Sequence, residues 1–294
     1  MIVITAPTGG IGQQVLENVL QGGKPVRVIA RDPARLPAHL RDRVEVVLGS
    51  HGDAGVLDKA FAGADAVFWL LPPNPRAESL EAAYIDFTRP ACEAFRRHGV
   101  KRVVSVSALG RGTPMSKNAG YVTASLAMDD LIAATGVNYR ALVMPSFMDN
   151  LLRQVQSIKT RGVFVSPVSG DLKNPTCASR DIAAAAARLL LDDSWTGQGS
   201  LAVLGPEDLS FNEMAQIMSD VLGKPVRFQQ ITGEAFKARL MGFGTSEAMA
   251  QGALDMMLAK NAGLDKAEPR TSEASSPTSF RQWCVEVLKP ALAG

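Results

Sequence analysis

The sequence contains only three cysteines, Cys92, Cys177 and Cys284, in 294 residues. Because they are odd in number and far apart, they form neither a disulfide framework nor a zinc-binding motif, and they fit a reducing compartment. The three histidines are also isolated from other metal ligands, so no metal site is predicted.

An excess of charge of one sign is also missing. The chain has 31 Lys and Arg against 29 Asp and Glu, a formal net charge of +2, which gives no reason to expect nucleic acid or a membrane surface as a partner. No apolar run approaches the length of a membrane span, and the first strand begins at Ile2, which leaves no room for a signal peptide. We therefore expect a cytoplasmic protein with a small-molecule partner, and the sequence leaves a homodimer open.

Short apolar runs alternate with helical patterns through the first half of the chain. The predicted strands are Ile2–Thr5, Val26–Ala30, Val44–Leu48, Ala66–Leu71, Val103–Val106 and Tyr139–Val143. Several of these runs are apolar throughout, as expected where helices cover both faces of a parallel sheet. A helix is predicted over Glu78 to Arg97, with a kink at Pro90. The alternation predicts an α/β protein with a doubly wound parallel sheet.

After Asn150 the pattern changes. An alanine-rich helix beginning at Ser179-Arg-Asp-Ile is expected to return to the first domain. The remaining predicted elements are a helix opened by a capping box at Ser210–Glu213 and ended by Gly223, a strand over Val226–Ile231, helices near Gly233–Met241 and Ser246–Lys260, a surface connection over 265–279, and a final Phe280–Leu288 helix that docks through Phe280, Trp283 and Val287.

The stretch that follows the first strand points to a nucleotide. Ala6, Gly9 and Gly12 are spaced as in a G-x-x-G-x-x-G loop with alanine in the first place, between a strand and a helix expected from Gly10 to Leu20. Such a loop brings a pyrophosphate to the N–H groups of a helix N-terminus. The residues expected to bind it are Thr8, Gly9, Gly10, Ile11 and Gly12. An ordinary strand-to-helix turn is the alternative interpretation.

The residue after the second strand distinguishes the two nicotinamide dinucleotides. NAD-binding sheets carry an acidic residue there for the ribose hydroxyls, whereas this chain has Arg31, with Arg35 one turn later. A guanidinium pairs with a 2′-phosphate, so NADP(H) is favoured over NAD(H). The alternatives are that both arginines are simply solvated, or that Asp32 is the ribose acid. Asp32 is better explained as an N-cap followed by Pro33 at the first helical position.

Ligands of open α/β sheets bind beyond the carboxyl ends of the strands. The segments at those ends are Leu70–Pro73, Ser105–Ser107 and Pro145–Met148. Against the cofactor we expect Leu71, Pro72, Ser107, Pro145 and Phe147. For the substrate pocket we expect Pro73, Tyr121, Phe147, Met148 and Met241, although plain core packing also explains methionines of this kind.

These motifs resemble the NmrA-like group of atypical short-chain dehydrogenases/reductases. The resemblance rests on Ala6–Gly12, Arg31-Asp-Pro33, Val100–Ala108, Thr135–Tyr139, Pro145–Asn150 and Phe280-Arg-Gln-Trp283. It implies NADP(H) at the glycine-rich loop and a Rossmann domain with a smaller C-terminal α/β substrate domain. We place the Rossmann domain at 1–150, with 176–193 returning to it, and the substrate domain at 151–175 and 194–294. The group includes quinone, azo-compound and phenylpropanoid reductases, and also regulators that bind the nucleotide without turning it over.

The chain departs from short-chain dehydrogenases at their catalytic pair. They use Tyr-x-x-x-Lys, in which the lysine lowers the pKa of the tyrosine; here Tyr121 is followed four residues later by Ser125. Tyr121 and Ser107 remain the catalytic candidates, but each is also explained by packing or capping. Lys117 is not spaced to replace the lost lysine, and Met144-Pro145 replaces the usual Arg-Pro.

Two functions remain in competition. The first is an NADPH-dependent reductase of an electron-poor, largely apolar substrate such as a quinone, an azo compound or an imine, for which solvent supplies the proton. The alternative is a non-catalytic regulatory protein that senses NADP(H). A carbonyl reductase of the ordinary kind is disfavoured by Ser125.

Overall fold

The computed structural model describes all residues, 1–294, and the chain folds into two compact units, each made of three stretches of sequence. Unit 1 comprises Met1–Ser107, Ala124–Val143 and Ile182–Leu201. Unit 2 comprises Ala108–Thr123, Met144–Asp181 and Ala202–Gly294. No helix of the structure combines the length and apolar character needed to cross a membrane.

Unit 1 is built on a seven-stranded sheet with the strand order β10-β6-β5-β4-β1-β2-β3. Its strands are β1 (Ile2–Thr5), β2 (Val26–Ala30), β3 (Glu45–Leu48), β4 (Ala66–Trp69), β5 (Arg102–Ala108), β6 (Asn138–Met144) and β10 (Gln198–Ala202). β1 pairs in parallel with β2 and with β4, and Ile4 lies opposite Val28 and Phe68. The reversal of strand order beside β1 makes the sheet doubly wound and confirms the predicted fold class.

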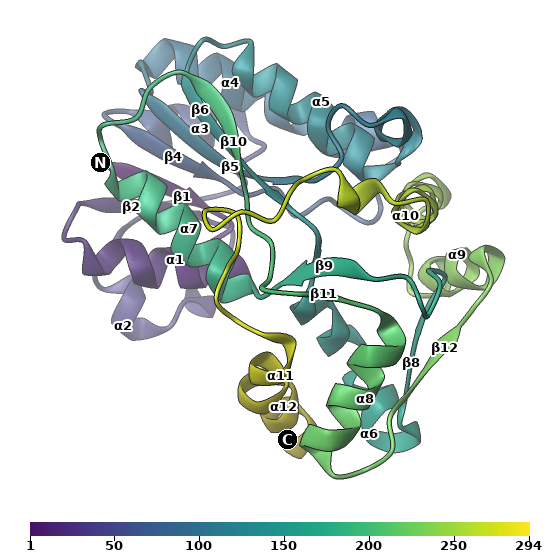
Figure 1. Ribbon diagram of the computed structural model, residues 1–294. Coiled ribbons are helices and arrows are strands. Elements are labelled where there is room, and N and C mark those ends of the chain that lie inside the picture. The colour runs from purple at the N-terminus through teal and green to yellow at the C-terminus, as the bar shows by residue number, and fades with distance from the viewer. The chain divides into compact units, whose positions relative to one another are not determined.

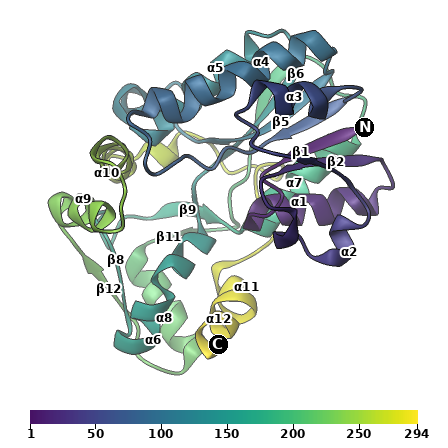
Figure 2. The same cartoon turned by 180° about the vertical axis from the view of Figure 1, so that it is seen from behind.

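Helices cover both faces of this sheet, with α1 and α7 on one side and α3, α4 and α5 on the other (Figures 1 and 2). The helices are α1 (Gly10–Gln21), α2 (Ala38–Arg41), α3 (Ala54–Phe61), α4 (Phe87–His98), α5 (Tyr121–Ala133) and α7 (Ser179–Leu191). Since both faces are covered, β1 and β4 are buried at every residue.

The helix predicted over Glu78 to Arg97 is interrupted earlier than expected. Its first turn is capped by the Ser79 hydroxyl, which accepts from the N–H of Ala82 at 3.0 Å, and a π-helical turn then occupies Ala82–Asp86. Pro90 lies inside α4 and offers no N–H to the carbonyl of Asp86. The irregular hydrogen bonding therefore lies in the turn before the proline. α4 ends at Gly99, which has the left-handed conformation.

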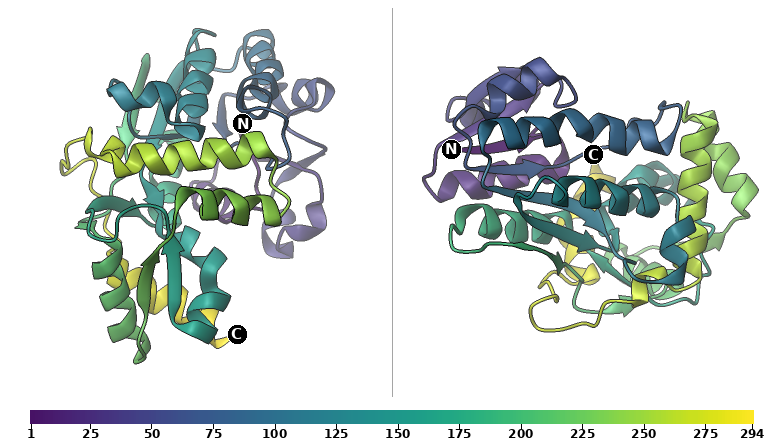
Figure 3. Two further views of the ribbon diagram at one scale, coloured as in Figure 1. Left: turned by 90° about the vertical axis from the view of Figure 1, so that its right-hand side faces the viewer. Right: turned by 90° about the horizontal axis from the view of Figure 1, so that it is seen from above.

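Unit 2 contains two small sheets, β11-β9-β7 and β12-β8, surrounded by helices. Its elements are β7 (Ser146–Phe147), α6 (Val155–Arg161), β8 (Val163–Ser166), β9 (Asn174–Cys177), β11 (Asp208–Leu209), α8 (Phe211–Leu222), β12 (Arg227–Gln230), α9 (Gly233–Gly242), α10 (Glu247–Asn261), α11 (Phe280–Trp283) and α12 (Lys289–Ala293). α9 and α10 pack side by side (Figure 3). The capping box of Ser210 and Glu213 is present at the start of α8, as predicted.

The core of unit 2 is built around aromatic residues. Phe280 and Trp283 stack with their ring centroids 5.7 Å apart and are fully buried with Met214 and Met218 of α8. Val287 packs against the same core, so the predicted docking of the last helix is confirmed.

The segment 265–279 was expected to be a surface connection, and this expectation was wrong in part. Asp265 and Thr278 are only 2% and 3% exposed. The Thr278 hydroxyl donates to the Asp181 carboxylate at 2.8 Å. The backbone N–H of Leu204 donates to the Ala274 carbonyl, and the N–H of Ser276 donates to the Leu204 carbonyl. Polar composition alone did not reveal these partners, because they lie far away in the sequence.

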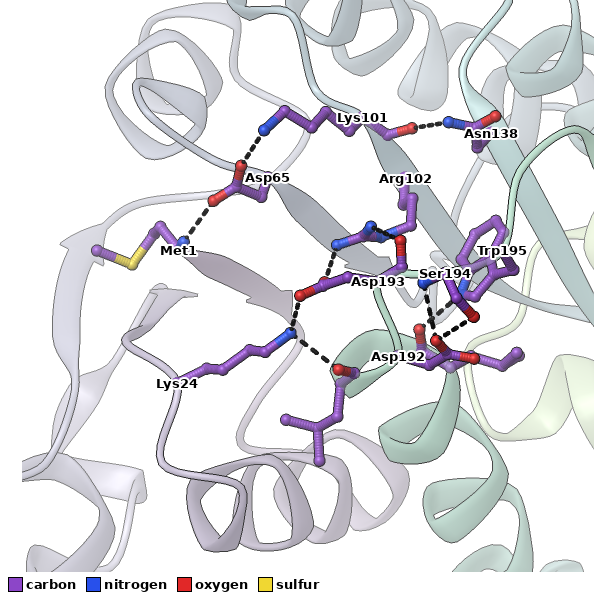
Figure 4. A network of polar contacts seen from close by, with 12 residues as sticks. Met1, Lys24, Asp65, Lys101, Arg102, Asn138, Asp192, Asp193, Ser194 and Trp195 are labelled. Carbon is purple, nitrogen blue, oxygen red and sulfur yellow. Dashed lines mark hydrogen bonds and ion pairs between the residues drawn. The ribbon is translucent and has the colours of Figure 1, made fainter.

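Ion pairs fasten the N-terminal ends of the strands in unit 1 (Figure 4). Asp193, in the loop after α7, pairs with Lys24 just before β2 at 2.7 Å and with Arg102 at the start of β5. Asp65, just before β4, pairs with Lys101 at 2.8 Å. These ion pairs therefore lie at the edge of the sheet opposite the carboxyl ends of the strands, where the nucleotide loop follows β1.

Candidate nucleotide and hydride-transfer site

The loop between β1 and α1 is closed by its own backbone. Ala6 has φ +49°, in the left-handed region, and its carbonyl accepts the N–H of Gly9 at 3.2 Å. A Cβ on Gly12 would lie only 2.1 Å from the Ala6 carbonyl oxygen, so only glycine fits at that position. The methyl group of Ala6 is therefore held in a backbone conformation that favours glycine.

The N-terminus of α1 is suited to an anion. Gly9 is the N-cap residue and supplies no side-chain hydrogen bond, and the first turn has no acidic residue. Gly9 and Gly10 are exposed, and a Cβ built on Gly10 would meet nothing within 4 Å. The first N–H groups of the helix are therefore open to a ligand from outside, and a dinucleotide pyrophosphate fits this cradle. Thr8 and Ile11 are half-buried beside it.

Thr5 holds the ends of β1 and β4 together. Its buried hydroxyl lies 3.1 Å from the carbonyl oxygens of Phe68 and Leu70 and accepts the N–H of Leu70 at 2.8 Å. This crosslink places Leu71, Pro72 and Pro73 directly after a fixed point beside the loop. Pro72 is exposed, while Leu71 and Pro73 are half-buried, so this segment presents apolar surface at the carboxyl edge of the sheet.

Two exposed arginines follow β2. Arg31 comes directly after the strand, and Arg35 ends a 3-10 turn that begins at Pro33. Asp32 caps that turn by accepting the N–H of Ala34 at 3.1 Å, which confirms the predicted cap. With its carboxylate engaged in this way, Asp32 is a poorer candidate for the ribose hydroxyls than a free acid would be.

His51, in the loop after β3, is close enough to Arg31 for their charges to interact. Its ring packs edge-on against Trp69 and Phe87, with centroids 5.2 and 4.9 Å away. Burial, assisted by the Arg31 charge, lowers the pKa of His51 to about 4. The imidazole is therefore neutral at pH 7, and Arg31 supplies the positive charge in this contact.

A buried polar cluster lies beneath the end of β5. Ser107 donates to the Asp129 carboxylate of α5 at 2.5 Å, and the Tyr139 hydroxyl of β6 donates to the same carboxylate at 2.6 Å. Ser105 bonds to Tyr139, and Ser125 lies 3.4 Å from Ser107. Of these residues the sequence had indicated Ser107 and Ser125. Asp129 was missed, although its spacing of four residues from Ser125 places both on one helix face.

Tyr121 is not an activated acid. Burial raises the pKa of its hydroxyl, and the partly opposing charge of Arg153 does not reverse the shift. Catalytic tyrosines of short-chain dehydrogenases need the opposite shift, which a lysine supplies. A phenol with a raised pKa is a poor proton donor at pH 7, so Tyr121 is better suited to lining a pocket.

The remaining candidates lie in unit 2 and differ in exposure. Pro145 is buried and Phe147, in β7, is half-buried. Met148 is 1% exposed within the core that contains Phe280, so packing explains this methionine without a ligand. Met241, at the end of α9, is 43% exposed and is not part of that core. The two methionines therefore do not form one cluster.

Comparison with known proteins shows the family of the chain. A sequence model described as NAD(P)H-binding matches residues 7–193. A (4-alkanoyl-5-oxo-2,5-dihydrofuran-3-yl)methyl phosphate reductase from Streptomyces griseus is 31% identical over 97% of both chains. The NAD(P)H azoreductase of Xenophilus azovorans is 29% identical over 85% of this chain and 84% of its own. An NADPH complex of an Escherichia coli quinone oxidoreductase has the same fold, with a TM-score of 0.77 at 22% identity over 100% of this chain and 99% of its own.

Fold, nucleotide cradle and relatives together define an NAD(P)H-dependent oxidoreductase. More specifically, the chain belongs to the NAD(P)H-binding family whose model spans the loop, the polar cluster and α7.

Proposed function

We propose that this protein is an NADPH-dependent reductase that transfers hydride to an electron-poor, largely apolar substrate such as a quinone, an azo compound or an imine. The observation that carries the proposal is the absence of an activated proton donor: Ser125 stands where a lysine would be needed, and the pKa of Tyr121 is raised. Electron-poor acceptors tolerate this absence because hydride transfer to them needs mainly orientation, and water supplies the proton afterwards.

The substrates for which the relatives are named support an electron-poor acceptor. An acylated furanone and a quinone each have a C=C bond conjugated with a carbonyl group, and an azo compound has an electron-poor N=N bond. The bound dihydronicotinamide would supply the hydride. In our proposal the loop at Gly9 to Gly12 holds the pyrophosphate, and Leu71, Pro72 and Ser107 line the path toward the nicotinamide.

We further propose that the cofactor is NADPH rather than NADH and that the chain is a member of the NmrA-like group. Arg31 is exposed at the end of β2, where a guanidinium meets the 2′-phosphate of the adenosine ribose. Unit 1 would then hold the dinucleotide through this arginine and the loop at Gly9 to Gly12.

The test is a turnover panel. Purified protein with NADPH is given a naphthoquinone, an azo dye, an acylated furanone and a cyclic imine, and loss of cofactor absorbance is followed. Turnover of at least one acceptor is expected. Tight NADPH binding without turnover of any acceptor would overturn the proposal and favour a protein that only senses the nucleotide.

A further inference from the structure

The buried carboxylate of Asp129 acts as an acceptor at both of its oxygens. Its Oδ2 receives the proton of Ser107 and its Oδ1 receives the proton of Tyr139, at 2.5 and 2.6 Å. The ionised form of Asp129 accounts for both contacts, because each carboxylate oxygen can then accept a hydroxyl proton. Both distances lie in the range of hydroxyl groups bonded to an anion. Asp129 is only 3% exposed, so its negative charge is poorly screened.

This arrangement fixes the direction in which Ser107 bonds. A hydroxyl has one proton and two lone pairs, and the proton of Ser107 is directed to Asp129. Ser125, 3.4 Å away, is free to donate to Ser107 rather than to take its proton. Ser107 lies one residue before the end of β5, at the carboxyl edge of the sheet. Toward a ligand at that edge, Ser107 therefore presents a lone pair with a carboxylate behind it.

A lone pair at this place opposes one kind of chemistry and favours another. Reduction of a carbonyl builds negative charge on oxygen, which requires a hydrogen-bond donor. An acceptor backed by an anion stabilises a positive charge and an N–H group instead.

We propose, resting on the function proposed above, that Ser107 and Asp129 select a cationic hydride acceptor that carries an N–H, namely a protonated imine. The iminium N–H donates to Ser107 Oγ, and the Asp129 charge stabilises the cation through that hydroxyl. Asp129 is in this sense a positioning residue, since it acts on the substrate through Ser107.

The reaction balances without a proton from the protein. The imine carbon receives a hydride, one hydrogen with two electrons, from the dihydronicotinamide. The π pair of the C=N bond becomes the lone pair of the amine nitrogen, which already carries its proton. The products are a neutral amine and the oxidised nicotinamide. The step needs no acid from the protein, so it does not depend on Tyr121, whose pKa is raised by burial.

The first test compares acceptors within each variant. kcat/KM is measured with 3,4-dihydroisoquinoline and with a naphthoquinone of similar size, for the wild type, Asp129→Asn, Ser107→Ala and Tyr139→Phe. Asp129→Asn and Ser107→Ala each remove a charge-assisted hydrogen bond. Each should lower the ratio of kcat/KM for the imine to kcat/KM for the quinone by about tenfold or more. Tyr139→Phe is the matched control: it removes the other hydroxyl from Asp129 but leaves Ser107 directed as before, and should keep the ratio.

The second test measures binding without turnover. The NADP⁺-loaded protein is titrated by calorimetry with protonated tetrahydroisoquinoline and with isochroman, its neutral oxygen analogue. The wild type should prefer the cation, and Asp129→Asn and Ser107→Ala should lose that preference by about tenfold. Thermal unfolding and NADPH affinity establish whether each variant is folded. If Asp129→Asn does not fold, Ser107→Ala alone provides the test.

The outcomes separate the two proposals. No turnover of any acceptor contradicts the reductase function. A second outcome is turnover of the quinone while neither variant changes the imine-to-quinone ratio or the cation preference. That result overturns the role of Ser107 and Asp129 but leaves the reductase function standing.

Discussion

Ala6 and Gly12 meet so closely that a Cβ on residue 12 would lie 2.1 Å from the Ala6 carbonyl oxygen. The same Cβ would lie 2.8 Å from the carbonyl carbon. Because β1 holds the backbone at Ala6 and α1 holds the backbone at Gly12, neither backbone can move away without disturbing a strand or a helix. The contact sets the distance between strand and helix, and with it the width of the phosphate cradle.

Gly12→Ala should therefore weaken NADPH binding by at least about tenfold and lower the free energy of unfolding by about 1–3 kcal/mol, the usual cost of overpacking. Fluorescence titration with NADPH and urea unfolding measure the two effects. Gly242→Ala, at the exposed end of α9 and outside the loop, is the control, since a Cβ there meets nothing within 4 Å. Equal behaviour of the two variants would contradict the close contact.

Ala6→Gly should raise the free energy of unfolding by about 1 kcal/mol, because glycine adopts the left-handed conformation of this residue without the steric cost that alanine bears. The same change at the exposed helical residue Ala127 of α5 should lower stability by about 1 kcal/mol. Urea unfolding of both variants checks the opposite signs. Destabilisation by both would show that Ala6 is unstrained.

Arg31→Asp should raise the KM for NADPH much more than the KM for NADH, because a carboxylate repels the 2′-phosphate that the guanidinium would pair with. Steady-state kinetics with both cofactors and one acceptor measure the difference. Arg161→Asp, at the exposed end of α6, controls for the change of net charge and should leave the cofactor preference alone. An equal effect of Arg31→Asp on both cofactors would rule out the 2′-phosphate contact.

His51 predicts a stability that depends on pH. Its pKa is lowered from 6.5 to about 4 in the folded protein, so the unfolded chain binds the additional proton first. Its contribution is complete above pH 6.5 and is lost as pH falls toward about 4, at about 1.4 kcal/mol per pH unit. His51→Phe, which keeps a ring against Trp69 and Phe87, should flatten the stability curve over this window.

The comparison is urea unfolding at several pH values between 4 and 7, with a replacement of the exposed His39 as control. A curve for His51→Phe as steep as that of the wild type would show that another group causes the loss.

Lys260 and Asp265 form an ion pair in unit 2 with side chains only 7% and 2% exposed. Lys260→Met should cost about 3–5 kcal/mol because it leaves the Asp265 carboxylate buried without its partner. The double variant Lys260→Met, Asp265→Leu should recover most of this loss. Lys173→Met removes an exposed partner of Glu213 and should cost no more than about 1 kcal/mol. Urea unfolding of the wild type and the three variants measures these differences in the free energy of unfolding.

The sheet of unit 1 was predictable where its strands are buried. β1 and β2 have the predicted bounds, because Ile2–Thr5 and Val26–Ala30 are short apolar runs between turn residues. β10 was not predicted, since Gln198–Ala202 is an edge strand with polar and small residues that its neighbour β6 holds in place. β7, β8, β9 and β11 were missed because they have only two to four residues each and pair with strands far away in the sequence.

The site was predictable where it is local. The loop from Ala6 to Gly12 and the cap at Asp32 depend on residues a few positions apart. The left-handed φ of Ala6 and the bond from Ser107 to Asp129 depend instead on how α1 and α5 pack, which no local pattern records. Tyr139 illustrates the limit, because it reads as a strand residue and its hydroxyl function emerges only beside Asp129.

The alternation of the chain between the two units has a consequence for synthesis. Unit 1 requires residues up to Leu201, and by then two of the three stretches of unit 2 have already been made. No single truncation of the chain therefore isolates either unit, and each unit is complete only after stretches of the other have been made.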